Sequence, residues 1–244
     1  MLLERIRAER TSGKFPNRDR PLGYDAFMSV MLNRGIYDVA EVAHLLAVDP
    51  ERVVRWATPD SRGSPAIAGP SFDRAFSFAE LVSFAIALEI RQRGVSDLDV
   101  RRGLQVLREE HRVDHPLALR DVVSTIGTSG ASLVAKLHGQ WFDVGKGRQA
   151  AFDSIIELYP KHLRFDDAGA VSAWAPVPHI LLDPQIQAGA PCVAGTRITT
   201  ATIHALLDDD SIDEVADEYG LSIEEVDAAD KFEQRLLDGV GLAA

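Results

Sequence analysis

The residues best suited to chemistry in this chain are two arginines, Arg52 and Arg55, in the stretch DPERVVRWA. We expect a helix there that turns Val53, Val54 and Trp56 inward, so that both guanidinium groups point outward. Arginine can donate two parallel hydrogen bonds to the edge of a guanine or to a phosphate. The pair therefore predicts a contact with DNA, and the alternative is two solvated arginines on an ordinary surface helix.

Further basic residues surround this pair. Arg62 and Arg74 lie in or just beyond a stretch rich in proline, glycine and serine, residues 59–71, which predicts a wing beside the helix. Residues 1–25 predict a basic arm, which would add sequence-independent contacts to phosphates or to the minor groove. Such an arm is equally often a mobile tail. Its basic residues are Arg5, Arg7, Arg10, Lys14, Arg18 and Arg20.

Local capping patterns position the two arginines. Residues 25–34 predict a first helix, which a glycine ends. Asp38, followed three positions later by Glu41, predicts a capping box at the start of a second helix. Asp49 and Pro50 predict the start of the arginine-bearing helix after a short break. Two short helices joined so tightly predict a helix-turn-helix.

Two longer helices complete this first domain. Ser77 and Glu80 predict a capping box before an apolar helix over residues 78–93, and Ser96 predicts the start of the next helix. We assign residues 26–112 to a winged helix-turn-helix DNA-binding domain.

Residues 113–175 predict a mixed α/β segment that bridges two domains. Short strands are expected at residues 133–137 and 162–165, and a helix at residues 149–158. The sequence GKGR at residues 145–148 could bind a phosphate at the start of that helix. It lacks the spacing of a Walker motif, however, and an ordinary turn is the favoured interpretation.

Residues 176–244 predict a C-terminal domain of three helices in a helix-turn-helix-like arrangement. The expected elements are strands at 179–182 and within 191–198, a helix at 199–207, and two helices begun by the capping boxes Ser211–Glu214 and Ser222–Glu225. The last two helices carry many acids, which would repel DNA. We therefore predict that this domain presents a surface for protein binding or dimerisation. The alternative is that the acids only confer solubility.

The distribution of charge supports this division. The net charge is -11, but residues 1–112 hold 17 Lys and Arg against 16 Asp and Glu, whereas residues 113–244 hold 9 against 21. A chain with one near-neutral, arginine-bearing half and one strongly acidic half suits contact of DNA by the first half and of a basic protein by the second. Overall we expect a mainly α protein with small β elements, an α+β fold. The absence of long apolar runs predicts a cytoplasmic protein with no membrane contact.

No pattern of residues predicts an enzyme. The seven histidines are widely spaced, and His204 is interpreted as a core residue and not as a metal ligand. The single cysteine, Cys192, is expected to be buried and inert. The triplet at residues 208–210 predicts a turn, and the rival hypothesis is a nuclease that binds a metal with Asp208 and Asp210. We therefore predict no catalytic residues, no metal and no cofactor.

The stretch YDVAEVAHLLAVDPERVVRWA, followed after a loop by FSFAELVSFAIALEIRQRGVSDLDVRRGLQVL, resembles the winged helix-turn-helix of MerR regulators over residues 36–107. The resemblance implies a recognition helix, a wing and a second, supporting helix pair. Regulators of this family usually continue into a long coiled-coil helix. The chain departs from that pattern at His115-Pro116, where the helical pattern stops.

Residues 178–235 resemble a small antitoxin-type domain, formally of unknown function, that is common beside PIN-domain toxins. The resemblance rests on Leu182-Asp183-Pro184, Gly189, Pro191 and Gly195-Thr196-Arg197-Ile198. The combined architecture resembles VapB-like antitoxins. It implies a homodimer that binds operator DNA, represses its own operon and neutralises a PIN-type ribonuclease toxin with its C-terminal part.

Two groups of residues follow from this second resemblance. Gly195, Thr196 and Arg197 are expected to be structural or to contribute to the dimer. The toxin is expected to contact Glu224, Glu225, Asp227, Asp230 and Phe232. The alternative function is a stand-alone MerR-like transcriptional regulator that has no toxin partner.

Overall fold

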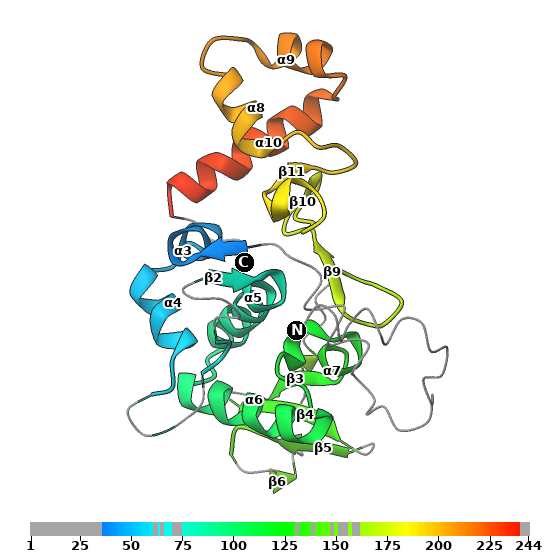
Figure 1. The fold of residues 1–244 in the computed structure, drawn as a ribbon. Helices are drawn as coiled ribbons and strands as arrows, with labels where there is room; N and C mark the ends of the chain where they lie inside the picture. Colours follow the sequence, from blue (N-terminus) through cyan, green and yellow to red (C-terminus); the bar gives the residue numbers. More distant parts are fainter. Residues whose placement is uncertain are drawn as a thin grey trace, which may run out of the picture.

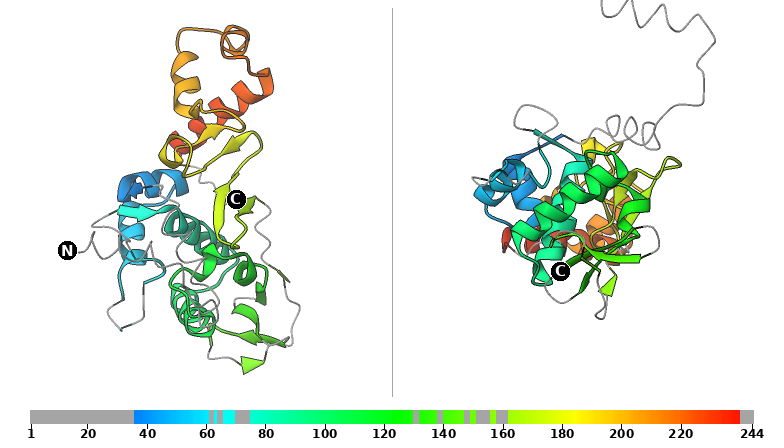
Figure 2. Two further views of the ribbon diagram at one scale, coloured as in Figure 1. Left: turned by 45° about the vertical axis from the view of Figure 1, so that its right-hand side comes forward. Right: turned by 90° about the horizontal axis from the view of Figure 1, so that it is seen from below.

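The computed structural model describes residues 36–60, 63, 66–69, 75–129, 132–137, 140–146, 149–150, 156–157 and 162–239. The predicted basic arm, the predicted first helix at residues 25–34, and the arginines Arg62 and Arg74 lie outside the described residues. The described part is elongated, with helices α8–α10 at one end, the sheet containing β4 and β5 at the other, and the N-terminal elements between them (Figures 1 and 2).

The first unit combines two short helices with two short strands. Its elements are β1 (Ile36–Asp38), α3 (Val39–Leu46), α4 (Pro50–Ala57) and β2 (Ala75–Ser77). The predicted capping box at α3 is confirmed, since Asp38 and Glu41 bond each other's backbone N–H. Asp49 caps α4, with Pro50 in its first turn, as predicted. The antiparallel pairing of β1 with β2 was not predicted, because it joins segments far apart in the sequence.

Two longer helices, α5 (Phe78–Gln92) and α6 (Asp97–His111), support this unit. The predicted caps at Ser77 and Ser96 are confirmed. Helix α5 is buried along almost its whole length, and its Phe84 ring stacks on Trp56 of α4 at a centroid distance of 6.0 Å. The prediction that Val54 faces inward was wrong, since its side chain is 48% exposed. Val53 and Trp56 are the buried residues of α4, and Ala57 also packs against the core.

The middle of the chain forms a five-stranded antiparallel sheet in the order β6-β5-β4-β3-β7. After η1 (Pro116–Ala118) and α7 (Arg120–Val123), the strands are β3 (Ile126–Ser129), β4 (Ser132–Leu137), β5 (Gln140–Asp143), β6 (Gln149–Ala150) and β7 (Ile156–Glu157). The prediction of a helix at residues 149–158 was therefore wrong, because both described parts of that range extend the sheet. Gly103 of α6 lies close against β4, where an added Cβ would come within 2.5 Å of Leu133 Cδ2.

A hairpin leads from the sheet to the C-terminal unit. It consists of β8 (Leu163–Phe165) and β9 (Val171–Trp174). The backbone N–H groups of Trp174 and Leu182 each donate a hydrogen bond to the carbonyl of the other residue. The remaining elements are β10 (Ile180–Leu181), η2 (Gln187–Gly189), β11 (Cys192–Val193), α8 (Thr200–Leu206), α9 (Ile212–Tyr219) and α10 (Ile223–Leu237). The predicted capping boxes at α9 and α10 are both confirmed.

The three C-terminal helices pack around a small apolar core. Val226, Ala229 and Phe232 of α10 face inward as predicted, and Ile203 of α8 and Val215 of α9 meet them. Ile223 was expected on the same face but is 52% exposed. The fold is thus a mixture of helices with small antiparallel sheets, the α+β class that the sequence predicted. No helix in the described part of the chain is both long enough and apolar enough to cross a bilayer.

Candidate nucleic-acid and partner interfaces

The arginine pair lies on the side of α4 that does not pack against the core. Arg55 is exposed, whereas Arg52 is half-buried because its guanidinium lies over the Trp56 ring, 5.8 Å from the ring centroid. The exposed Val54 extends the same surface. An apolar side chain beside two guanidinium groups can contact the methyl group of thymine while the arginines bind guanine or phosphate.

Sequence reasoning missed Arg101, which fixes the end of α4. Its side chain is only 5% exposed, and its Nη1 donates to the Thr58 carbonyl at 2.9 Å while Nη2 donates to the Arg55 carbonyl. Desolvation by burial lowers the Arg101 pKa from its usual range, and the nearby Asp60 and Asp97 oppose that effect. A charged group thus satisfies carbonyls that a helix end leaves unpaired. The sequence could have indicated this role, because Arg101 lies three positions before Leu104, on the apolar face of α6.

Arg108, two turns further along α6, anchors the segment where a wing was predicted. Its Nη2 donates to the Ile67 carbonyl and its Nε to the Asp114 carbonyl at 2.9 Å. The Ile67 N–H in turn donates to the Trp56 carbonyl at 2.8 Å. Burial lowers the Arg108 pKa. Two arginines of α6 therefore hold α4 and the following segment in fixed positions. Of the four predicted DNA-binding residues, the structure brings together Arg52 and Arg55.

The Gly195-Thr196-Arg197 sequence forms the turn after β11. Gly195 has φ +84°, a conformation that favours glycine, and nothing lies within 4 Å of an added Cβ. The Thr196 hydroxyl donates to the Val193 carbonyl at 2.9 Å and accepts from the Ile198 N–H at 3.0 Å. Arg197 is exposed, and within the described part of the chain its guanidinium has no hydrogen-bond or ion-pair partner. Glycine and threonine thus shape the turn, while the arginine points to solvent.

The residues predicted to contact a toxin differ in their exposure to solvent and in their partners within the chain. Glu225 caps its own helix, Asp230 bonds His204 Nδ1 at 2.7 Å and Gln234 at 2.6 Å, and Phe232 is only 1% exposed in the core. Asp227 pairs with Lys231 at 2.7 Å, and Glu224 is exposed. Glu225, Asp227 and Asp230 thus have partners within their own chain and Phe232 lies in the core, while the contact of these residues with a toxin stays a prediction.

A more accessible acidic surface lies on α9 and the turn before it. The triplet at residues 208–210 forms that turn, as predicted, with Asp209 and Asp210 N–H groups donating to the Leu206 carbonyl. The exposed acids of this acidic surface are Asp208, Asp209, Asp210, Asp213, Asp217 and Glu218. The surface lies at the far end of the molecule from β6 (Figure 1).

The N-terminal and C-terminal units meet directly. The buried Tyr37 hydroxyl of β1 donates to the Gly189 carbonyl at 2.9 Å, and burial raises the Tyr37 pKa well above its usual range. A cleft of about 280 Å³ adjoins this bond, and His44 of α3 and Glu233 of α10 help to line it. Helix α3, which precedes the arginine-bearing helix α4, is therefore in contact with the C-terminal unit.

The other candidate sites have structural roles. Cys192 is buried, and burial raises the pKa of its thiol, which favours the unreactive protonated form. Gly145 and Lys146 lie in a turn after β5, as favoured from the sequence, and no helix begins at residue 149, so the alternative of a phosphate site lacks its helix N-terminus. Among the described residues, no group of three or more His, Cys, Asp and Glu is placed to hold a metal ion.

Comparison with known proteins finds similarity to a family, to a related sequence and to a solved structure. Residues 180–232 match a family described as "Protein of unknown function (DUF433)". The chain is 25% identical over 232 residues to the uncharacterized protein Rv2308 of Mycobacterium tuberculosis, covering 84% of this chain and 92% of that protein. The fold is similar to the crystal structure of Rv2018 from the same organism, with a TM-score of 0.58 and 21% identity over 79% of this chain and 96% of that one. The C-terminal segment thus carries a recognisable domain, and the architecture of most of the chain occurs in a solved structure.

Proposed function

We propose that this protein is a DNA-binding transcriptional repressor whose recognition helix is α4, in a winged helix-turn-helix of the MerR type. The observation that carries the proposal is the outward placement of Arg52 and Arg55 on a helix whose far end is held by Arg101. Fixing a recognition helix in advance reduces the entropy lost when its side chains bind a base edge. The DNA it reads is the region upstream of its own gene.

The first experiment measures binding of the purified chain to a duplex from that upstream region. The R52A/R55A double variant is expected to lose about 1–3 kcal/mol per specific contact, and the slope of log affinity against log salt should fall by about 1 for each lost phosphate contact. R164A, at an exposed arginine on β8, is the matched control and should bind like the wild type. Unchanged affinity of the double variant would show that α4 is not the recognition helix.

A second activity is proposed for the C-terminal unit, namely neutralisation of a PIN-type ribonuclease toxin, as in VapB-like antitoxins. The observation that favours it is the acidic surface of α9 and the preceding turn, which suits the basic surface that a ribonuclease needs to attract RNA phosphates. Covering that surface would inhibit the toxin sterically, so the antitoxin itself needs no catalytic group.

This activity is tested by co-expression with the small open reading frame next to the gene, followed by purification and an RNase assay. A stable complex that gains RNase activity when this chain is removed supports the antitoxin proposal. The D213K/D217K variant should weaken the complex, while E109K/D121K, which alters exposed acids elsewhere, should not. If no complex forms but the upstream DNA is bound, the protein is a stand-alone regulator.

A further inference from the structure

Three exposed side chains of different chemistry lie on the outward side of α4. They are Glu51, Val54 and Arg55, and the valine is 48% exposed. Because an α-helix has about 3.6 residues per turn, residues three and four positions after Glu51 lie on either side of it one turn later. The carboxylate therefore lies between the valine and the arginine. Figure 1 shows α4 at an edge of the described part of the molecule.

The two charged groups of this set have no partner in the described part of the chain. The Glu51 carboxylate there accepts no hydrogen bond and forms no ion pair, and only its backbone N–H is bonded, to Asp49 Oδ1 at 2.7 Å. Arg55 is bonded only through its carbonyl, which accepts from Arg101. Both charges are thus available to a ligand, whereas the guanidinium of Arg52 lies over the Trp56 ring.

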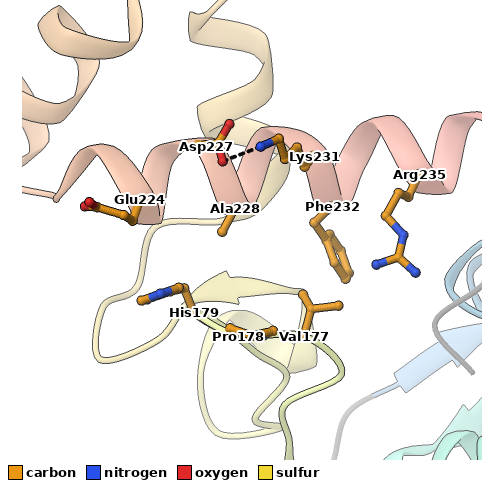
Figure 3. Close-up of a pocket in the computed structure, with 9 residues that line it drawn as sticks. All are labelled: Val177, Pro178, His179, Glu224, Asp227, Ala228, Lys231, Phe232 and Arg235. Atoms are coloured by element: carbon orange, nitrogen blue, oxygen red, sulfur yellow. Dashed lines mark hydrogen bonds and ion pairs between the residues drawn. The ribbon is translucent and has the colours of Figure 1, made fainter. Parts of the chain in front are cut away.

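Helix α10 shows the opposite arrangement. Its charged side chains line a cavity of about 320 Å³ against the chain's own residues 177–179 (Figure 3). Asp227 there is paired with Lys231, and 2.7 Å separates the carboxylate oxygen from the ammonium nitrogen. An acid on a helix surface can therefore be neutralised within this chain, but the acid in the middle of the outward side of α4 is not.

A carboxylate in that position is unfavourable for binding phosphates, because both groups are negatively charged. It is favourable at the major-groove edge of cytosine, whose N4 amino group donates a hydrogen bond to glutamate. A valine in the same groove can cover the C5 methyl group of thymine. The fork of Arg55 fits the N7 and O6 acceptors of guanine. Glu51 and Val54 thus gain nothing from the DNA backbone and suit base edges only.

We infer that Glu51 and Val54 are specificity-determining residues of α4, which select a cytosine and a neighbouring thymine in the major groove. The inference rests on the proposed DNA-binding function and adds which bases the helix requires. Side chains three positions apart on a helix are separated by about 5–6 Å, and base pairs are stacked about 3.4 Å apart, so the two contacts fall on neighbouring pairs. Glu51 also acts by exclusion, because a base that presents an acceptor leaves the carboxylate unpaired.

Deoxyuridine tests the contact of Val54, because it lacks only the C5 methyl group of thymidine. Each thymidine of the upstream duplex is replaced in turn. The wild type should lose about fourfold in affinity at one position, the effect of exposing one methyl group. V54A should be insensitive to that replacement, and it should remain folded because alanine is the better helix former. I223A, at an exposed isoleucine of α10, is the matched control and should respond like the wild type.

The variant E51Q tests the carboxylate, since it removes the charge and keeps the size of the side chain. It should bind a random-sequence duplex about twofold more tightly, because one repulsion of phosphates is lost. Its preference for the upstream duplex over the random one should nevertheless fall by about fivefold or more. E109Q, at an exposed glutamate of α6, is the matched control and should behave like the wild type.

Replacing each C·G pair of the upstream duplex by T·A locates the cytosine. The wild type should lose about 5–150-fold in affinity at one position. E51Q should lose less there, because an amide can donate to the O4 of thymine as well as accept from the N4 of cytosine. Circular dichroism checks that every variant is folded.

The results separate this inference from the function on which it rests. A wild type that does not prefer the upstream duplex to the random one would contradict the DNA-binding proposal and this inference together. If the wild type prefers the upstream duplex, but either V54A or E51Q keeps all its base preferences, the inference alone is overturned.

Discussion

At the scale of single residues, two arginines in and beside α4 differ in exposure and in role. Arg55 is exposed and available to a ligand, whereas Arg101 is buried and bonded to the backbone of α4. A buried guanidinium with two carbonyl partners costs desolvation but fixes geometry, because its planar fork allows few alternative arrangements. Arg101 is thus a positioning residue for the proposed recognition helix.

Replacing Arg101 by methionine should affect both stability and DNA binding. Loss of a charged hydrogen-bond donor to two carbonyls is expected to lower the free energy of unfolding by about 1.5–3 kcal/mol. Affinity for the upstream duplex should fall by about tenfold even where the variant is fully folded. The reason is that Arg55 loses its fixed position, and a base contact of this kind contributes about 1–3 kcal/mol. R101K should recover part of the affinity, since one ammonium can still donate to a carbonyl.

Denaturant titration and DNA-binding measurements at the same temperature separate these two effects. R102M, at the exposed neighbouring position on α6, is the control and should change neither quantity appreciably. An R101M variant that is destabilised but binds DNA with wild-type affinity would show that Arg101 supports the fold alone.

At the scale of elements, four helices of the two terminal units, α3, α5, α9 and α10, begin with capping boxes. In α9 and α10, Glu214 and Glu225 each accept hydrogen bonds from the serine that precedes the helix. Hydrogen bonds to Ser211 lower the Glu214 pKa, and hydrogen bonds to Ser222 lower the Glu225 pKa. These carboxylates therefore link the stability of the C-terminal unit to pH.

Acidification should destabilise the C-terminal unit through these two carboxylates. A carboxyl group whose pKa is lower in the folded state contributes stability above its unfolded pKa, about 4.3, and loses it as pH falls through the folded value. The denaturation midpoint is thus expected to fall as the pH drops below about 4.5. The E214Q/E225Q variant should be less stable at neutral pH and show a smaller decrease on acidification.

Denaturation curves of the two proteins between neutral and acidic pH test this expectation. E218Q, which alters an exposed acid of α9 outside the capping boxes, provides the comparison and should follow the wild type. Identical pH profiles for E214Q/E225Q and the wild type would argue against any contribution of the caps to the acid response.

At the scale of the whole molecule, the N-terminal and C-terminal units are joined by a direct contact as well as by the chain. The bond from Tyr37 to Gly189 connects β1, next to α3, with the turn before β11, and the C-terminal end of α10 lies close to α3 (Figure 1). The C-terminal unit therefore has a defined position relative to α3 and to α4, the proposed recognition helix.

Removing the Tyr37 hydroxyl should loosen this junction. Y37F is expected to lower the free energy of unfolding by about 1 kcal/mol, because the Gly189 carbonyl loses a donor at a buried site. Y219F, at a tyrosine of α9 without a hydrogen bond from its hydroxyl in the described structure, is the matched control. Hydrogen exchange should show faster exchange in β1 and around residue 189 for Y37F alone. Unchanged exchange there would mean that the other contacts hold the units together.

The sequence by itself determined the helix starts and the α+β class. Asp38, Ser77, Ser211 and Ser222 were identified because a capping box is formed by residues three apart, whose geometry depends little on the rest of the chain. The turn at residues 208–210 was predicted for the same local reason.

Only the tertiary structure decided which faces are buried and which distant groups meet. Val54 and Ile223 have apolar side chains at helical spacing, yet both are exposed, because the core contacts of α4 and α10 are filled by their neighbours. Residues 149–150 joined the sheet because a strand edge was available at Phe142 and Asp143. The role of Arg101 depends on carbonyls more than 40 positions earlier in the chain. Burial and long-range pairing are set by the packing of segments far apart in sequence, which no local pattern records.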